Sequence, residues 1–337
     1  MVDLSRRKFC RSIGKGALTL AGVLATPCST ALELVVESDV VRKKIVYDDD
    51  YYAKISNPDY PAKGDVWATE EQKKLLDSCH DKLSRARRYI GFSRFNYADM
   101  ETILKVAETG RKTGRIDNNK AEKLEPFTKN EKGFMEDLFR FDAKEYGFYG
   151  EKVITDYNHK IDPDTLIHVP GSGHCLIDSQ PRKVYEKIKT EAAQYRNQNG
   201  NQVKIMLTSG IRNIPKQAHL FLGKALRVDY NLSAASRSLA PPGYSWHGAG
   251  DFDVGKPDAG MMNFTPEFTE TDQYRALKDL GYLKLIRYPT NNKEGVRFEP
   301  WHIMVGHSIR DFQKNIGNIA KTSFMPDYKG VEKILLA

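Results

Sequence analysis

The chain has 337 residues, of which 40% are hydrophobic and 28% are charged, and its mean hydropathy is negative. This composition is typical of a soluble globular protein and excludes a disordered or membrane-embedded one. The formal net charge is +8, but no clustered basic stripe with a matching motif accompanies it, so we expect no nucleic acid partner.

Residues 1–31 have the order of an export signal. Basic residues come first, an apolar stretch follows over residues 16–25, and small residues end the segment. The Arg6-Arg7 pair, followed by Lys-Phe, resembles the twin-arginine signal that exports folded proteins. We therefore predict a twin-arginine-type signal peptide, with the twin-arginine export machinery as a partner in transit. A basic tail in front of a buried helix is the alternative.

Export predicts a periplasmic protein. The apolar stretch is too short to span a bilayer permanently, so we expect no integral membrane segment after signal removal. Cys28 could carry a lipid anchor, but Pro27 directly before it favours a soluble form. Removal of residues 1–31 takes away five basic residues and one acidic residue, which lowers the net charge from +8 to +4.

Two segments precede the β-rich part of the chain. Residues 32–68 are polar and rich in aspartate, and Pro58 and Pro61 would break any long element, so we predict an extended lead-in. Residues 69–150 space their apolar side chains as helices do, which predicts a helical N-terminal region.

Residues 151–337 contain short β-rich runs punctuated by glycine and proline. We predict strands at 166–169, 203–207 and 250–254 and helices at 181–197 and 215–226. Strands mixed with helices, without regular βαβ alternation, predict an α+β fold with a small antiparallel sheet flanked by helices. The run from Gly171 to His174 lacks the lysine and Ser/Thr ending of a phosphate loop, so we interpret it as a turn.

Two cysteines, Cys79 and Cys175, remain after the signal is removed. In an oxidising compartment they could form a disulfide or stay free, and the sequence alone leaves both possibilities open. Neither lies in a CxxC pair, so a cysteine-based zinc site is not expected.

Two of the eight histidines, His247 and His302, each follow a tryptophan, and by itself such a histidine is more often a packed, hydrogen-bonded residue than a metal ligand. A hydrolytic zinc needs three protein ligands and an open position for water, and two imidazoles with one carboxylate meet that need. Glu299, three residues before His302, is a candidate base. Regular strand geometry would put these two side chains on opposite faces, so we expect a backbone bend at Pro300.

Four motifs resemble those of the VanY-like D-alanyl-D-alanine carboxypeptidases, within the zinc peptidases that also include lysostaphin-type enzymes and the hedgehog fold. They are Ser209-Gly210-Ile211-Arg212 with Gln217, Pro241 through Asp253, Tyr288-Pro289, and Glu299-Pro300-Trp301-His302. Their order and approximate spacing agree with the family pattern from Ser209 to His302, and the first half of the chain is not covered.

The resemblance implies a role for each of seven residues. The expected ligands of Zn2+ are His247, Asp253 and His302; Glu299 is the expected general base, Arg212 the group that steadies the oxyanion, and Ser245 and Gln217 the groups that hold the substrate's C-terminal residue. The family places its aspartate seven residues after the histidine, at the position of Val254 here, and a one-residue deletion explains the shift. Asp251, on the same strand face by period-2 alternation, is the rival ligand.

The expected function is that of an exported zinc D-alanyl-D-alanine carboxypeptidase, and its expected partner is a peptidoglycan stem peptide ending in D-alanine. An L,D-carboxypeptidase or a peptidoglycan endopeptidase on the same scaffold is one alternative, and a non-catalytic cell-wall-binding module is another. The helical region 69–150 would then be either a wall-docking domain or a lid. His307 and Arg237 are expected to be structural or solvated rather than part of the site.

Overall fold

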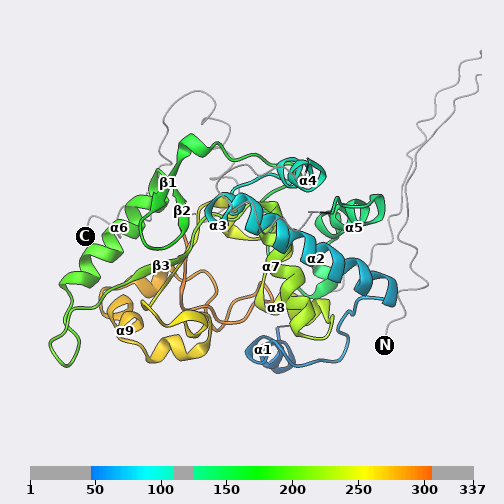
Figure 1. The fold of residues 1–337 in the computed structure, drawn as a ribbon. Helices are drawn as coiled ribbons and strands as arrows, with labels where there is room; N and C mark the ends of the chain where they lie inside the picture. Colours follow the sequence, from blue (N-terminus) through cyan, green and yellow to red (C-terminus); the bar gives the residue numbers. More distant parts are fainter. Residues whose placement is uncertain (1–46, 110–124, 306–337) are drawn as a thin grey trace, which may run out of the picture.

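The structure is a computed structural model that describes residues 47–109 and 125–305. The predicted signal peptide, Cys28 and His307 lie outside these residues. Helices of the described N-terminal part lie beside the later helices α7 and α8 at one end of the molecule (Figure 1). The strands, α6 and α9 lie at the other end.

The lead-in predicted as extended contains a helix, α1 (Asp49–Ser56). The Asp48 side chain caps it by accepting a hydrogen bond from the backbone N–H of Tyr51, which satisfies one of the free donors of the first turn. The helix buries Tyr51 and Ile55. The prediction of an extended segment was therefore wrong for residues 49–56. A capping aspartate and two buried side chains stabilise a short helix there.

The N-terminal helical region was predicted as helical, and the structure has four α-helices in its described residues: α2 (Glu70–Ile90), α3 (Phe92–Phe95), α4 (Met100–Thr109) and α5 (Lys129–Arg140). Capping boxes at Thr69 and Thr128 begin α2 and α5. A buried ion pair of 2.7 Å between Lys82 and Glu131 joins these two helices.

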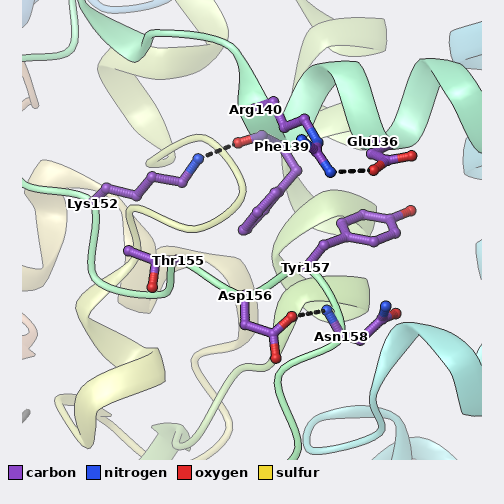
Figure 2. A pocket seen from close by; sticks show the side chains of 8 residues that line it. All are labelled: Glu136, Phe139, Arg140, Lys152, Thr155, Asp156, Tyr157 and Asn158. Atoms are coloured by element: carbon purple, nitrogen blue, oxygen red, sulfur yellow. Dashed lines mark hydrogen bonds and ion pairs between the residues drawn. The ribbon is translucent and has the colours of Figure 1, made fainter. Parts of the chain in front are cut away.

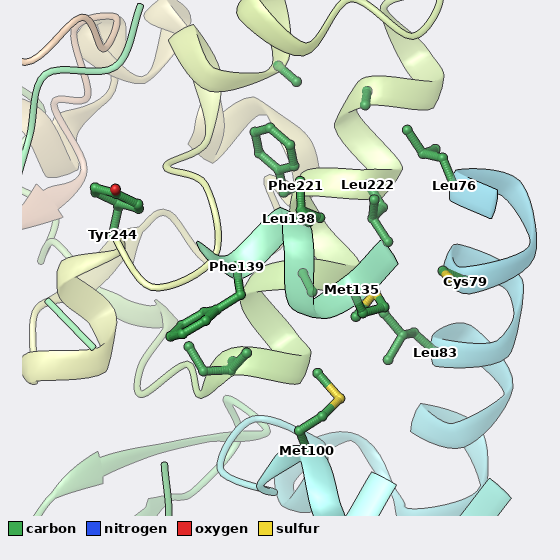
Figure 3. Close-up of a cluster of buried hydrophobic side chains, with 14 of the residues drawn as sticks. Leu76, Cys79, Leu83, Met100, Met135, Leu138, Phe139, Phe221, Leu222 and Tyr244 are labelled. Atoms are coloured by element: carbon green, nitrogen blue, oxygen red, sulfur yellow. The ribbon is translucent and has the colours of Figure 1, made fainter. Parts of the chain in front are cut away.

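These helices share one hydrophobic core with α7 (Ile214–Arg227) and α8 (Leu232–Ser238). Figure 3 shows side chains from α2, α4, α5 and α7 meeting in that core. Tyr244 and Trp246, which come just before His247, belong to the same cluster. The described N-terminal helices therefore support the segment that leads into the candidate site.

Two small antiparallel sheets follow the helical part. The first is a hairpin of β1 (Leu166–Val169) and β2 (His174–Ile177), and its turn is the glycine-containing run predicted as a turn. The second has the strand order β3 (Met206–Ser209), β4 (Phe252–Gly255), β5 (His302–Ile303). The predicted α+β fold with a small antiparallel sheet is thus confirmed.

A second hydrophobic cluster lies between this sheet and the helices α6 (Gln180–Gln194) and α9 (Asp272–Asp279). Helices α6 and α7 match their predicted ranges to within a few residues. Short 3-10 helices complete the description: η3 (Ala143–Tyr146), η4 (Pro163–Thr165), η5 (Trp246–Ala249), η6 (Gly260–Phe264), η7 (Pro266–Glu270) and η8 (Tyr282–Leu285).

Both remaining cysteines are free thiols, Cys79 on α2 and Cys175 on β2. Burial raises the pKa of Cys79 to about 12, so its thiol stays protonated and unreactive. None of the described helices combines the length and the apolar character that a bilayer-spanning helix needs.

Candidate metal centre

The register of the three-stranded sheet brings two of the predicted ligands into one row with Ser209. Asp253 on the central strand β4 pairs with Ser209 on β3 and with His302 on β5. Because residues directly opposite one another in an antiparallel pair point to the same face, the side chains of Asp253 and His302 lie together. Both are nearly fully buried.

His247 reaches this row from the 3-10 helix η5, just before β4. Its Nδ1 lies 2.8 Å from the carbonyl oxygen of Gly210. Burial and the nearby Arg212 lower the pKa of His247, so the ring is neutral. A neutral ring that donates from Nδ1 has its lone pair on Nε2, and this atom faces Asp253.

Gly210 can make this contact because it has no side chain. A Cβ at this position would lie 2.0 Å from the carbonyl oxygen of Cys175 on β2. That carbonyl accepts a hydrogen bond of 2.9 Å from the backbone N–H of Ile211. The glycine of the Ser209-Gly210 motif therefore lets the chain pass close to the hairpin and present its own carbonyl to His247.

A turn before β5 brings Glu299 and His302 together, as the expected bend at Pro300 required. The backbone N–H of His302 donates to the carbonyl of Glu299 over 3.1 Å. The carboxylate Oε2 of Glu299 lies 3.1 Å from Nδ1 of His302. The base candidate is therefore held beside the ring nitrogen that faces the site.

His247, Asp253 and His302 offer three ligand atoms that all lie within 4.8 Å of one another. Nε2 of His247 is 3.3 Å from Oδ1 of Asp253, and Nδ1 of His302 is 3.6 Å from the same oxygen. Ligand atoms about 2.0–2.2 Å from a tetrahedral zinc are roughly 3.3–3.6 Å apart. The observed separations therefore fit a zinc ion.

Two of the three ligand atoms are buried without a hydrogen-bond partner among the described residues. They are Nε2 of His247 and Oδ1 of Asp253. A buried polar atom without a partner is costly, and two such atoms facing each other point to a shared cation. The donor set of two imidazoles and one carboxylate is also the one that a hydrolytic zinc takes.

Arg212 holds the other oxygen of Asp253. Its Nη2 donates to Oδ2 over 2.5 Å, and its Nε donates to the hydroxyl of Ser209 over 2.8 Å. Burial alone would raise the pKa of Asp253, but the positive charges of Arg212 and of the protonated His302 ring outweigh it and hold that pKa below its usual range. The carboxylate is therefore ionised and oriented, and a fixed positive charge lies beside the site.

Asp251, the rival ligand, lies on the opposite side of the His302 ring from Asp253. Its Oδ2 is 3.2 Å from Nε2 of His302. Its two oxygens also accept hydrogen bonds from the guanidinium of Arg287 and from the backbone N–H of Val305. Asp251 therefore orients His302. The carboxylate in the group of three possible metal ligands is that of Asp253.

The His302 imidazole is surrounded by carboxylates. Burial alone would lower its pKa, but hydrogen bonds with Asp251 and Glu299 and the charge of Asp253 raise it to about 9. Without a cation the ring is therefore protonated. A metal at Nδ1 would take the place of this proton.

Ser245 and Gln217 lie close to the site but differ in how they are engaged. Gln217 donates from Nε2 to the carbonyl of Arg212 and accepts at Oε1 from the backbone N–H of Gly243, both over 2.8 Å. It therefore braces α7 against the loop at 241–243, a different role from the substrate contact that the resemblance implies. Ser245 precedes η5 and is 7% exposed, with no hydrogen bond of its hydroxyl among the described residues.

Arg237, expected as a solvated charge on a loop, is buried on helix α8. It makes an ion pair of 2.8 Å with Asp65 and donates to the carbonyls of Pro58 and Tyr60. That expectation was wrong because the lead-in folds back over α8 and supplies the partner. Arg237 ties the two segments together.

A pocket on the surface is lined by eight residues, among them Phe139, Lys152 and Tyr157 (Figure 2). Lys152 lines it and donates to the carbonyl of Phe139 over 2.5 Å. The backbone N–H groups of Val153 and Ile154 next to it both donate to the carbonyl of Gly243. None of the seven predicted site residues lines this pocket.

Sequence reasoning missed three residues that adjoin the site. Arg287 holds Asp251, and its position directly before the Tyr288-Pro289 motif was the one available signal. His174 and Lys216 are buried close to Arg212. His174 ends the run interpreted as a turn, and no motif marks Lys216. Both reach this place by packing on Phe92 of α3.

Comparison with known proteins gives a family match for part of the chain. Residues 182–306 match the family model described as VanY, D-alanyl-D-alanine carboxypeptidase. This range includes all seven predicted site residues, and the resemblance inferred from the motifs is thus confirmed for it. No curated protein matches the chain.

Two solved structures are also similar. One is a mutant of the vancomycin-resistance D,D-pentapeptidase VanY from the VanB-type resistance cassette in complex with Zn(II), with 21% identity, a TM-score of 0.36, and coverage of 50% of this chain and 90% of that one. The other is VanYB in complex with D-alanine-D-alanine, with 20% identity, a TM-score of 0.36, and coverage of 52% of this chain and 97% of that one.

Proposed function

We propose that the VanY-type segment at residues 182–306 makes this protein a zinc-dependent D-alanyl-D-alanine carboxypeptidase that acts on peptidoglycan stem peptides. One observation carries the proposal. The partnerless atoms Nε2 of His247 and Oδ1 of Asp253 face Nδ1 of His302, and the carboxylate of Glu299 lies beside that nitrogen. This is a set of three ligands and a base.

His247, Asp253 and His302 would hold the zinc. When bound, it would supply Lewis-acid polarisation of the scissile carbonyl and lower the pKa of a water molecule. Glu299 then serves as general base: it accepts the proton of the attacking water and returns it to the leaving amine. Its place beside His302 keeps this carboxylate within reach of the site.

Arg212 stabilises the negative charge that develops on the carbonyl oxygen. Its guanidinium is fixed by Ser209 and Asp253, so it is oriented before substrate arrives. Preorganised charge of this kind stabilises a transition state without reorganisation. A protein that only bound the cell wall would not need Glu299 and Arg212, and their positions favour catalysis over the binding-module alternative.

The D,D specificity is supported by the family match. An L,D-carboxypeptidase or an endopeptidase on the same scaffold would use the same metal centre. We further propose that the protein is exported to the periplasm by the twin-arginine route. The support for export is the order of basic, apolar and small residues in 1–31.

The test is incubation of the purified protein with defined stem pentapeptides and tetrapeptides, with and without a chelator, followed by mass analysis of the fragments. We expect chelator-sensitive release of one terminal D-alanine. Release of a larger fragment would favour the endopeptidase, and cleavage only of a tetrapeptide would favour the L,D-carboxypeptidase. Absence of any cleavage by the zinc-loaded protein would contradict the proposal.

A further inference from the structure

Four side chains from four separate elements, α2, α3, β2 and α7, form a cluster centred on one aromatic ring near the candidate metal centre. We name them the Phe92 cluster: Arg87, Phe92, His174 and Lys216. The guanidinium carbon of Arg87 lies 4.4 Å from the centre of the Phe92 ring, and Nζ of Lys216 lies 5.1 Å from it. His174 meets the same ring edge-on, with 5.0 Å between ring centres.

Lys216 is buried without an anion. Its side chain is 5% exposed, and neither Lys216 nor Arg87 forms an ion pair with any carboxylate in the described part of the chain. Lysine is almost never buried in this way unless it is paired. Burial, with added repulsion from Arg87 and Arg212, lowers the pKa of Lys216 to about 7. That direction is the one expected where no negative charge compensates.

The Phe92 cluster adjoins the metal centre through His174. Burial and the charges of Lys216 and Arg212 lower the pKa of His174 to about 3, and the charge of Asp253 acts on it in the opposite direction. The next residue, Cys175, also contacts the segment that carries Arg212, because its carbonyl oxygen accepts a hydrogen bond of 2.9 Å from the backbone N–H of Ile211. Asp253 cannot compensate Lys216, because its oxygens serve Arg212 and the ligand set.

The Phe92 cluster also has a way to the surface. Arg87 and Phe92 are half-buried, whereas Lys216 and His174 lie deeper. The turn of the β1–β2 hairpin borders it, because the hydroxyl of Ser93 donates to the carbonyl of Gly173 over 2.9 Å. A ligand would therefore reach Lys216 from the half-buried side of the cluster, past Arg87 and Phe92.

We propose that the Phe92 cluster binds a carboxylate of the substrate peptide next to the metal centre. Lys216 and Arg87 would give it charge-assisted hydrogen bonds, which are about twice as strong as neutral ones. Phe92 holds both cations in place by cation–π contact. The inference rests on the proposed function only in taking a peptide as the ligand. The carboxylate is either the C-terminal one or one on a side chain.

The test measures binding by calorimetry in a Glu299→Ala background, so that turnover does not interfere. Three zinc-bound variants are compared: the background alone, the background with Lys216→Met, and the background with the exposed Lys278→Met as matched control. Each is titrated with a stem peptide as free acid, with its C-terminal amide, and with its side-chain amide. Unfolding midpoints and zinc content verify that each variant is folded and loaded.

We expect Lys216→Met to weaken binding of the free acid by about 10- to 100-fold and Lys278→Met to leave it unchanged. The amide that lacks the recognised carboxylate should bind the background and Lys216→Met equally, and this identifies which carboxylate the cluster takes. Arg87→Met, at a more exposed position, gives a second variant if Lys216→Met does not fold. Equal weakening of all three peptides, or no weakening, would overturn the inference.

Failure of this inference is distinguishable from failure of the proposed function. Wild-type protein that releases D-alanine but shows no carboxylate dependence at Lys216 would leave the function standing and remove the subsite. Carboxylate-dependent binding without any cleavage by the wild type would support the subsite and contradict the proposed function.

Discussion

Asp251 and His302 are joined at the ring nitrogen that faces away from the metal ligands: Oδ2 of Asp251 lies 3.2 Å from Nε2, whereas Nδ1 is 3.6 Å from Oδ1 of Asp253. Arg287 fixes Asp251 in turn, and its guanidinium lies 3.9 Å above the Trp246 ring. A carboxylate that accepts from one ring nitrogen sets the tautomer and strengthens the other as a ligand.

We predict that Asp251→Ala lowers zinc affinity by about 10- to 100-fold, the range typical of partners that orient metal ligands. Competition titration with a chromophoric zinc chelator measures this. Asp178→Ala, which removes an exposed ion pair with Arg182, is the matched control and should leave zinc affinity unchanged. Unaltered affinity in Asp251→Ala would mean that Asp251 does not position His302.

Zinc affinity should rise with pH. The pKa of His302 is raised from 6.5 to about 9 in the metal-free protein, so a proton must leave before Nδ1 can bind metal. Affinity should therefore increase by about tenfold per pH unit from 6.5 up to 9. Zinc titrations at several pH values measure the slope, and a flat profile would contradict the predicted proton displacement.

The metal-free protein should show the opposite trend in its free energy of unfolding. A raised folded-state pKa means that the folded protein keeps a proton that the unfolded chain has lost between pH 6.5 and 9. The contribution of His302 is full below pH 6.5 and is lost as pH rises through 9. Denaturant unfolding across this range should show the loss in the wild type and its absence in His302→Ala.

Glu299 and His302 should separate metal binding from turnover. Glu299→Ala removes the base but none of the three ligand atoms, so we expect full zinc content and no cleavage. His302→Ala removes a ligand and should lose most of its zinc. Metal analysis measures the zinc content of both variants, and a peptide cleavage assay measures their turnover. Residual turnover near the wild-type rate in Glu299→Ala would assign the base to another group.

Arg237 should matter for stability rather than for chemistry. Its ion pair with Asp65 is buried, with side chains 6% and 5% exposed, and removal of one partner leaves the other charge buried. Arg237→Ala should cost about 3–5 kcal/mol in the free energy of unfolding, with zinc affinity unchanged in the molecules that fold. Arg182→Ala, from an exposed pair, should cost at most about 1 kcal/mol.

The candidate ligands could be found from sequence because each stands in a motif: His247 and Asp253 around the Pro-Pro-Gly run, and His302 after Glu299. The choice between Asp251 and Asp253 could not be made, because alternation places both on one face. The structure separates them because Gly250, at φ +107, turns the chain before β4 begins at Phe252. Pairing with β3 and β5 then fixes Asp253 in the row of site residues.

Long-range contacts were beyond sequence reasoning. Helix ranges followed from apolar spacing, and α6 and α7 agree with prediction to a few residues. The partners of Arg237 and Lys216 depend on how segments far apart in the chain pack together. Asp65, for instance, is 172 residues away from Arg237, and no local pattern connects them.

The N-terminal helices share one hydrophobic core with α7 and Trp246. This shared core determines where the chain can be cut into shorter fragments that still fold. The family match begins at residue 182, and the sequence changes from helical to β-rich character after Gly150. A chain that starts there would leave the apolar face of α7 exposed to water and would lose the packing behind η5, on which His247 is held. The C-terminal half of the chain therefore does not keep the geometry of the metal centre by itself. Substitutions on either side of the shared core have to preserve its packing if the site is to stay intact.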